Sequence, residues 1–285
     1  MADYLRGYAA HFNLPVVLNC PVETVCREEE VFAVGTVGGG AYRGRAVVAA
    51  TGSFRDPYLP DVPGRSEFRG QVLHSSDYRN PESFVGQRVV VVGGGNSGVQ
   101  IAVELARVAC VSLAVRRRVW FVPPRVLGRD LHWWLRWTGL DSLRLFEDHG
   151  TPFVIDAGQY RQAVAQGRPE QRKVVTRFTP EGVVWADGKA EAVDAVIFAT
   201  GFRPGLAYLG GLGAVDGSGR VQQRGGVSTA VPGLYFVGLS GQRTFASATL
   251  RGVGPDAAWV VRHLRRRLAN LRGRCGDSSD WEGPA

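Results

Sequence analysis

The sequence predicts an α/β fold built on a dinucleotide-binding, Rossmann-like unit, and three observations carry this prediction. Arg88–Val92 (RVVVV) is a continuous apolar run, as expected of a parallel strand that is buried on both faces. A glycine-rich turn, Gly93–Gly98, follows it directly, and the apolar pattern predicts a helix from Asn96 to about Arg107. A second strand, Val111–Val115, completes the order of strand, glycine turn, helix and strand that is typical of one half of such a fold.

Composition narrows the class of protein. The 285 residues are 45% apolar and 21% charged, a balance typical of a globular chain, and the formal net charge is +8. No apolar run approaches the roughly 20 residues of a membrane span, and we expect no signal peptide at the start. The four cysteines form neither a CxxC pair nor a zinc-ligand cluster with histidines. We therefore expect a cytoplasmic α/β protein without a metal site and without a nucleic-acid partner.

The glycine turn has the GxGxxG spacing of a dinucleotide site. In this pattern Gly93 permits a tight turn, Gly95 lets the backbone approach a pyrophosphate, and Gly98 lets the helix pack closely on the strand. The free N–H groups at the start of the helix attract the phosphates. The prediction is that Gly93, Gly95, Asn96, Ser97 and Gly98 bind the pyrophosphate, against the alternative of an ordinary glycine-rich turn.

The end of the second predicted strand indicates which nucleotide binds. An NAD site usually has an acidic residue there, which accepts a hydrogen bond from the ribose 2′-OH. This sequence has Arg116, Arg117 and Arg118 instead, and guanidinium groups favour a 2′-phosphate. The prediction is NADPH, with Arg116 and Arg117 on its 2′-phosphate; a solvated basic loop is the alternative.

Two further patterns need explanation. The segments 47–57 (VVAATGSFRDP) and 196–204 (VIFATGFRP) share an apolar strand, an Ala-Thr-Gly turn, a Phe-Arg pair and a proline. Residues 68–78 (FRGQVLHSSDY) carry a spaced set of Phe, Gly, His and Tyr that composition does not explain. Taken alone, the histidine of this set is interpreted as a structural histidine in a loop. The last helix is expected to begin at Pro255.

This spaced set resembles the fingerprint of the flavin-containing monooxygenases, which here comprises Phe68, Gly70, His74 and Tyr78. The segments 151–158 and 183–204 resemble the YUCCA-type branch, and 234–239 and 252–257 resemble the flavin domain. The resemblance runs from residue 1 to about 270. It implies a two-lobed flavoprotein that uses NADPH, FAD and O2 to insert one oxygen atom into a small organic substrate. It also implies flavin contacts at Thr51, Gly52, Gly238 and Asp256, and a fingerprint that couples NADPH to the flavin; no catalytic acid or base can be named.

One departure from the family concerns its first GxGxxG, because this sequence has only one such motif. The resemblance therefore implies a flavin lobe that is incomplete at its N-terminus, and three explanations stay open: a start placed too late in the sequence, a true truncation, or a piece supplied by a separate chain. The strand 46–50 is then expected to have an unpaired apolar edge, which a complementing N-terminal chain or a second copy would cover. The expected domains are a remnant of the FAD-binding lobe with the inter-lobe connection (1–85), an NADPH-binding domain (86–195), the C-terminal part of the FAD-binding lobe (196–272) and a disordered tail (273–285).

Several alternatives stay open. The chain is either the monooxygenase, a non-catalytic NADP-binding remnant or subunit, or a pyridine-nucleotide-dependent flavin reductase; a disulfide reductase would need a redox-active cysteine pair. The substrate and the type of oxidation are not determined. The aromatic run 132–137 (HWWLRW) is interpreted as a packing cluster, with a substrate channel or a membrane surface as alternatives.

Overall fold

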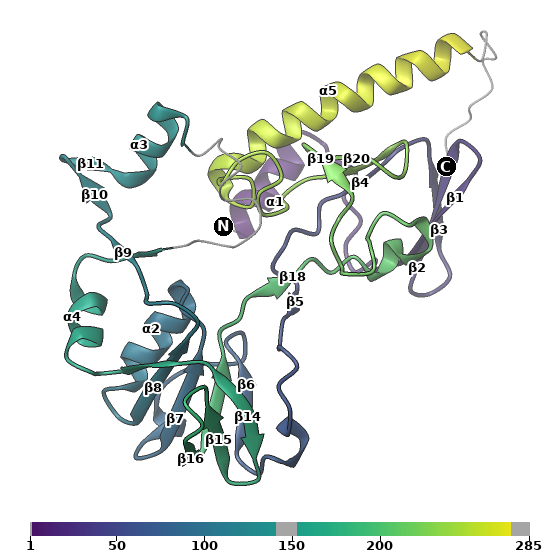
Figure 1. Ribbon diagram of the computed structural model, residues 1–285. Helices are drawn as coiled ribbons and strands as arrows, with labels where there is room; N and C mark the ends of the chain where they lie inside the picture. Colours follow the sequence, from purple (N-terminus) through teal and green to yellow (C-terminus); the bar gives the residue numbers. More distant parts are fainter. Residues whose placement is uncertain (1, 141–152, 275–285) are drawn as a thin grey trace. The chain divides into compact units, whose positions relative to one another are not determined.

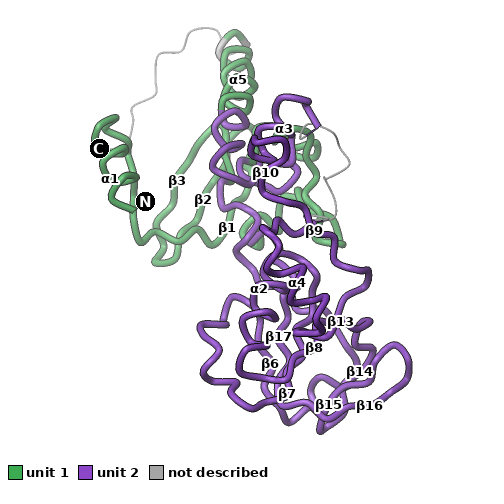
Figure 2. Tube along the Cα trace, turned by 90° about the vertical axis from the view of Figure 1, so that its left-hand side faces the viewer, with its two compact units in different colours: residues 1–49, 206–236, 258–285 green, residues 50–205, 237–257 purple. Residues whose placement is uncertain are grey.

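The computed structural model describes residues 2–140 and 153–274 (Figure 1). They form two compact units (Figure 2). Unit 1 comprises residues 1–49, 206–236 and those from 258 onward, and unit 2 comprises 50–205 and 237–257. The segment expected to bind NADPH, 86–195, lies within unit 2. No helix in the described part of the chain combines the length and the apolar character needed to cross a bilayer.

Unit 2 is built on a five-stranded parallel sheet, which confirms the predicted α/β class. Its strand order is β13-β8-β7-β17-β6, and every neighbouring pair is parallel. The bounds are β6 (Gln71–His74), β7 (Arg88–Val92), β8 (Cys110–Val115), β13 (Glu170–Lys173) and β17 (Ala195–Phe198). The predicted strands at 88–92 and 111–115 are confirmed.

Both faces of this sheet are covered, which explains the unbroken apolar runs of its strands. On one face, helix α2 (Asn96–Leu105) packs on Val89 and Val91 of β7, and α4 (Gln159–Ala165) packs on the same apolar cluster. On the other face, Val90 contacts an antiparallel meander through Phe178, Val183 and Trp185. The meander consists of β14 (Val175–Thr179), β15 (Gly182–Trp185) and β16 (Ala190–Ala192). Adjacent valines of one strand therefore enter two different cores.

Shorter elements complete unit 2. Strand β5 pairs with β18, β9 with β12, and β10 with β11. Their bounds, with those of the remaining helices, are β5 (Asp56–Pro57), η1 (Arg65–Glu67), η2 (Glu82–Phe84), β9 (Phe121–Val122), β10 (Arg125–Val126), β11 (Arg129–Asp130), α3 (Leu131–Thr138), β12 (Val154–Ile155) and β18 (Phe202–Arg203).

Unit 1 contains helix α1 (Ala2–His11) and two small sheets. The first is the antiparallel meander of β1 (Val22–Glu28), β2 (Val31–Thr36) and β3 (Ala41–Gly44). The second has the order β19-β20-β21-β4; its strands are β19 (Gln223–Arg224), β20 (Val227–Ser228), β21 (Leu234–Phe236) and β4 (Val47–Ala49), and η5 (Ala207–Leu212) lies nearby in sequence. Strand β4 ends this sheet, so no described strand pairs with its outer edge.

Helix α5 (Leu250–Arg274) begins five residues before the predicted start at Pro255. The N–H groups of Gly252 and Val253 donate to the carbonyl of Thr249, so the chain is already wound before the proline. Proline is tolerated near a helix start, where few N–H groups have a partner, and it does not mark the first residue. The predicted tail includes residues 273 and 274 of this helix, and the remainder of it lies outside the described residues.

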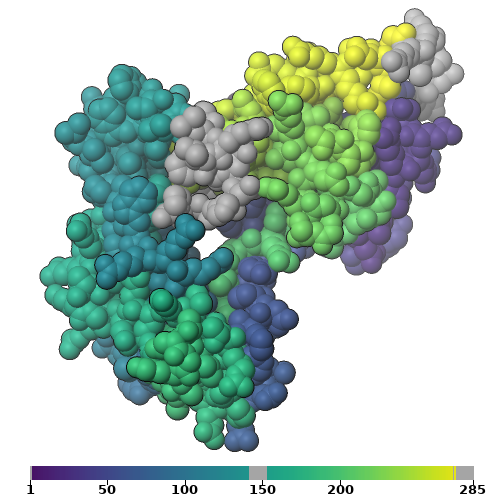
Figure 3. Space-filling view, viewed as in Figure 1, coloured from purple at the N-terminus to yellow at the C-terminus, as the bar shows by residue number. Residues whose placement is uncertain are grey.

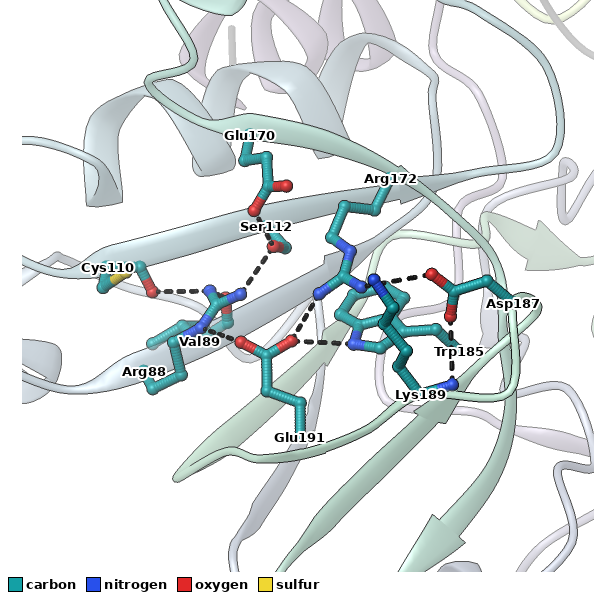
Figure 4. Close-up of polar contacts among 10 residues, drawn as sticks. All are labelled: Arg88, Val89, Cys110, Ser112, Glu170, Arg172, Trp185, Asp187, Lys189 and Glu191. Carbon is teal, nitrogen blue, oxygen red and sulfur yellow. Dashed lines mark hydrogen bonds and ion pairs between the residues drawn. The ribbon is translucent and has the colours of Figure 1, made fainter.

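A polar network holds the meander to the beginning of the parallel strands (Figure 4). Glu191 accepts hydrogen bonds from Arg88 Nε at 2.8 Å, from Arg172 Nη1 at 2.6 Å and from Trp185 Nε1 at 2.7 Å. Arg88 also donates to Ser112 Oγ at 2.7 Å. Burial acts to raise the pKa of Glu191, but these hydrogen bonds and the charges of both arginines outweigh burial and lower it.

This network predicts a pH-dependent contribution to stability. Glu191→Gln should lower the free energy of unfolding at pH 7 by about 1–3 kcal/mol, because a charge-assisted acceptor is lost. Since the pKa is lowered in the folded state, the stabilisation is complete above the ordinary glutamate pKa of about 4.3 and disappears as the pH falls through the lower folded value. Urea unfolding of both proteins across that range measures the difference. Glu181→Gln, on the same meander, is the control. A difference that stays constant with pH would contradict the assignment.

Candidate active site

The carboxyl ends of four neighbouring parallel strands bring most of the predicted site residues to one edge of the sheet. Strand β6 ends at His74, β7 leads into Gly93, β8 leads into Arg116, and β17 leads into Ala199. Helix α2 carries the chain from β7 to β8 on one side, whereas β17 lies on the other side of β7. Such a reversal of strand order opens a crevice, and ligands of open α/β sheets bind there.

The glycines of the turn have different tasks. Gly93 has φ +132°, and a Cβ on it would overlap the carbonyl oxygen of Ala199. A Cβ on Gly98 would overlap the carbonyl oxygen of Gly93. These two glycines therefore let α2 pack on β7 and β17. Around Gly95, by contrast, nothing lies within 4 Å of an added Cβ, so its outer face is open space against bare backbone, as a pyrophosphate requires.

The beginning of α2 is free to bind an anion. Gly95 is the N-cap, no side chain caps the helix, and its first turn has no acidic residue. The side-chain oxygen of Asn96 instead accepts a hydrogen bond from Ile155 N at 3.3 Å. The side chain of Asn96 thus has a structural role. Its predicted contribution to phosphate binding would come from its backbone N–H, beside that of Ser97.

The three arginines lie beside this turn. Arg116, Arg117 and Arg118 are exposed and follow β8, and a Cβ on Gly94 would lie 3.1 Å from Val115, the last residue of that strand. Among the described residues no carboxylate pairs with any of the three. Their charge is therefore available to an anionic ligand.

Two residues of the fingerprint belong to the core. Phe68 is buried and packs on Phe178, with ring centroids 5.2 Å apart. A Cβ on Gly70 would overlap the ring of Phe68 and the carbonyl of Asp194. The spacing of Phe68 and Gly70 therefore reflects close packing beneath the sheet.

His74 is the last residue of β6, which corrects its interpretation as a loop histidine. The ring is 2% exposed. The N–H of Ser76 can only donate, so Nδ1 accepts from it at 3.1 Å, and Nε2 carries the proton that it donates to the carbonyl of Gly201 at 2.9 Å. Both ring nitrogens are thus occupied, and the ring holds the Gly201 turn in place.

Tyr78 connects the fingerprint to helix α2. Its hydroxyl donates to Glu104 Oε2 at 2.8 Å. Burial and this hydrogen bond raise the pKa of Tyr78 far above its usual range, so it stays protonated. Sequence reasoning missed Glu104; the signal was the one carboxylate in a helix rich in apolar residues.

The two segments that repeat the Ala-Thr-Gly pattern meet in unit 2. Phe202 pairs with Pro57, and Arg203 pairs with Asp56, in the β5–β18 ladder. The Thr200 hydroxyl donates to the carbonyl of Tyr58. Gly201 accepts from Tyr58 N at 2.9 Å as well as from His74. The sequence showed the repeat but did not reveal that its two copies are hydrogen-bonded to each other.

The residues expected near flavin lie on turns of unit 2. Gly52 (φ +72°) and Gly238 (φ +87°) lie side by side, because a Cβ on Gly238 would be 3.8 Å from Gly52 Cα. Thr51 is exposed next to Gly52. In the chain these two turns directly follow β4 and β21, which are parallel neighbours in unit 1.

Asp256 has an unsatisfied acceptor. It is 1% exposed, and its Oδ1 accepts from Arg243 Nη1 at 3.2 Å, whereas its buried Oδ2 has no partner among the described residues. In the same segment the buried Nε2 of Gln242 also has no partner in the part of the chain that the structure describes. Buried polar groups normally have partners. One orphaned acceptor and one orphaned donor fit a ligand that has both hydroxyl and ring carbonyl groups, as flavin has.

Comparison with known proteins gives one consistent result. The model of the pyridine nucleotide-disulphide oxidoreductase family matches residues 1–238. An uncharacterised CzcO-like oxidoreductase of Geobacillus kaustophilus is 34% identical over 93% of this chain and 77% of its own length. The indole-3-pyruvate monooxygenase YUCCA4 of Oryza sativa is 28% identical over 94% of this chain and 71% of its own length. A flavin-containing monooxygenase structure from Stenotrophomonas maltophilia superimposes with a TM-score of 0.76, at 32% identity, covering 96% of this chain and 76% of that one.

The geometry of the glycine turn predicts that substitutions at Gly95 and Gly98 have different effects, one on nucleotide binding and the other on stability. Gly95→Ala should leave the thermal unfolding temperature nearly unchanged, because its Cβ enters open space, but it should weaken NADP⁺ binding by occupying the place of the pyrophosphate. Gly98→Ala, the matched variant, should destabilise the fold by several kcal/mol through overlap with Gly93. Calorimetric titration and thermal unfolding measure both effects. Unchanged NADP⁺ affinity in folded Gly95→Ala would contradict the placement.

Proposed function

The chain belongs to the flavin monooxygenase group of the pyridine nucleotide-disulphide oxidoreductase family, and on this premise we propose that it is an NADPH- and FAD-dependent monooxygenase of a small organic substrate. Members of this family use FAD and NADPH. The observation that carries the proposal is the open glycine turn at Gly95, with arginines at the end of the adjacent strand that pair with no carboxylate among the described residues. The cytoplasmic location expected from the sequence is part of the proposal.

The proposed NADPH site divides its work among named groups. Backbone N–H groups at the start of α2 hold the pyrophosphate, and Gly95 allows their close approach. Arg116 and Arg117 hold the 2′-phosphate by charge-assisted hydrogen bonds, which NADH cannot form. The hydrogen bond of His74 to Gly201 keeps this edge of the sheet in one arrangement, and that of Tyr78 to Glu104 holds the segment after β6 against the last turn of α2.

The proposed flavin contacts are Thr51, Gly52, Gly238 and Asp256. FAD, when bound, would supply the redox chemistry of the proposed oxygen transfer, with NADPH as the reductant and O2 as the oxygen donor. The protein positions the ring and excludes water from it. Asp256 Oδ2 offers a buried acceptor, and the contact of Arg243 with Oδ1 orients the carboxylate. The sequence has no second GxGxxG for the pyrophosphate of FAD.

The edge of β4, in unit 1, offers a place for a further strand. Val48 is exposed on this strand, and no described strand pairs with its outer edge. Exposed strand edges of apolar sequence readily pair with another chain. We propose that a further strand pairs here, from a complementing chain or from a second copy. If no such strand pairs here, the alternative function is that of an NADP-binding subunit. The observation that favours this alternative is that the glycine turn is well formed whereas the edge of β4 is open.

The arginine assignment predicts the nucleotide preference. Arg116→Ala combined with Arg117→Ala should weaken NADPH binding at least tenfold, because losing charge-assisted hydrogen bonds costs roughly 1.5–3 kcal/mol. NADH binding should be unaffected and serves as the internal control. Calorimetric titration of both nucleotides measures this. Equal loss for both would assign these arginines to the pyrophosphate or to folding instead.

The flavin assignment predicts a visible absorbance spectrum. After incubation with FAD and removal of free flavin, the purified chain should retain the flavin bands. If a second copy covers β4, the retained fraction should rise with protein concentration. Asp256→Asn should lower retention, because the buried acceptor loses its charge. A colourless chain that still binds NADPH would support the NADP-binding subunit instead.

A further inference from the structure

The hairpin β10–β11 has an unusual residue at its tip. Val126 pairs with Arg129, so the turn consists of Leu127 and Gly128 alone. Their φ angles are +48° and +73°, which is the type I′ geometry that favours Asn-Gly. A leucine is strained in this conformation. Its side chain is also 86% exposed. Leu127 is therefore unfavourable in two ways: its backbone is strained, and its apolar side chain is in contact with water. Folding does not require such a residue, so its presence indicates a function other than stabilising the fold.

Helix α3 follows the hairpin directly and extends the exposed apolar surface. None of its residues is buried. Trp133 and Trp137 stack in parallel with centroids 5.8 Å apart, and Trp137 is 70% exposed. Trp134 has a different task, because its Nε1 donates to the carbonyl of Val126 at 2.8 Å and joins the helix to the hairpin. Hairpin and helix are thus one module, which lies in the teal part of the surface in Figure 3, and it exposes aromatic and aliphatic groups.

The module is strongly basic. Arg125, Arg129 and Arg136 are exposed, and the guanidinium of Arg129 lies 5.3 Å from the centroid of the Trp133 ring. Asp130 is the one carboxylate between residues 125 and 138. It caps α3 by accepting from His132 N at 2.8 Å, so its charge serves the helix start.

We propose that this module, with Leu127, Trp133 and Trp137 as its apolar groups, docks on an anionic lipid bilayer. Tryptophan is enriched at the level of lipid headgroups, where its ring is apolar and its N–H is hydrated. Arginines beside it are attracted to anionic headgroups. A single-stranded nucleic acid fits less well, because Trp133 and Trp137 stack on each other and an aliphatic tip offers no stacking face. The attachment is peripheral and is independent of the proposed reaction.

Sedimentation with lipid vesicles tests the proposal on the full chain. The chain should bind vesicles of phosphatidylcholine with phosphatidylglycerol, bind pure phosphatidylcholine vesicles more weakly, and dissociate as the salt concentration rises. Arg125→Ser should weaken binding to the anionic vesicles about fivefold, since each arginine near the surface contributes comparably.

Leu127→Asn is the decisive variant. It removes the apolar tip and installs the residue that the turn favours, so the fold is kept while partitioning should fall roughly tenfold. Val85→Asn is the matched control, because Val85 is 64% exposed but lies before β7, at the opposite edge of the sheet from the site. Thermal unfolding checks each variant.

Three outcomes would overturn the proposal. The first is absence of vesicle binding by the unchanged chain. The second is equal binding by Leu127→Asn. The third is an oligomer, measured by light scattering without lipid, that Leu127→Asn dissociates while neither protein binds vesicles; the module would then contact a second copy.

Discussion

The close approach of helix α2 to strands β7 and β17 is the constraint on which the rest of unit 2 depends. Gly93 and Gly98 are in contact with backbone that leaves no room for a side chain. This contact brings the helix start to the carboxyl edge of the sheet, where its unpaired N–H groups point away from the strand. The placement of Gly95, of the arginines after β8 and of the Ala199 turn all follow from it.

The second determinant is the hydrogen-bonded junction at Gly201. One carbonyl accepts from a strand end, His74, and from the connecting segment at Tyr58. The fingerprint therefore joins separate parts of unit 2: Phe68 lies beneath the sheet, His74 lies at its edge, and Tyr78 is hydrogen-bonded to Glu104 of helix α2. Its spacing makes physical sense as packing and positioning, and none of its members offers a free acid or base.

The polar and apolar features of the remaining surface serve different ends. Glu191 and its arginines hold the meander on the sheet far from the carboxyl edge (Figure 4), whereas Asp256 keeps one buried oxygen without a partner. A satisfied network stabilises a fold, and an unsatisfied buried group calls for a ligand. Two apolar features are likewise not explained by folding: the edge of β4 and the tip of the hairpin at Leu127. Each exposes apolar groups to solvent.

The sequence by itself determined the α/β class, the strand and helix around the glycine turn, the family and its cofactors. These depend on local pattern: apolar runs, glycine spacing and the residue types of one motif. Tertiary structure alone decided that the two Ala-Thr-Gly segments pair, that His74 ends a strand and is occupied on both nitrogens, that Glu104 holds Tyr78, and that α5 begins before Pro255. The first three depend on atoms far apart in sequence, as when His74 meets Gly201, whereas the start of α5 depends on the hydrogen bonds of Gly252 and Val253 to Thr249. Spacing along the chain carries no record of such contacts, because they arise only when the strands align.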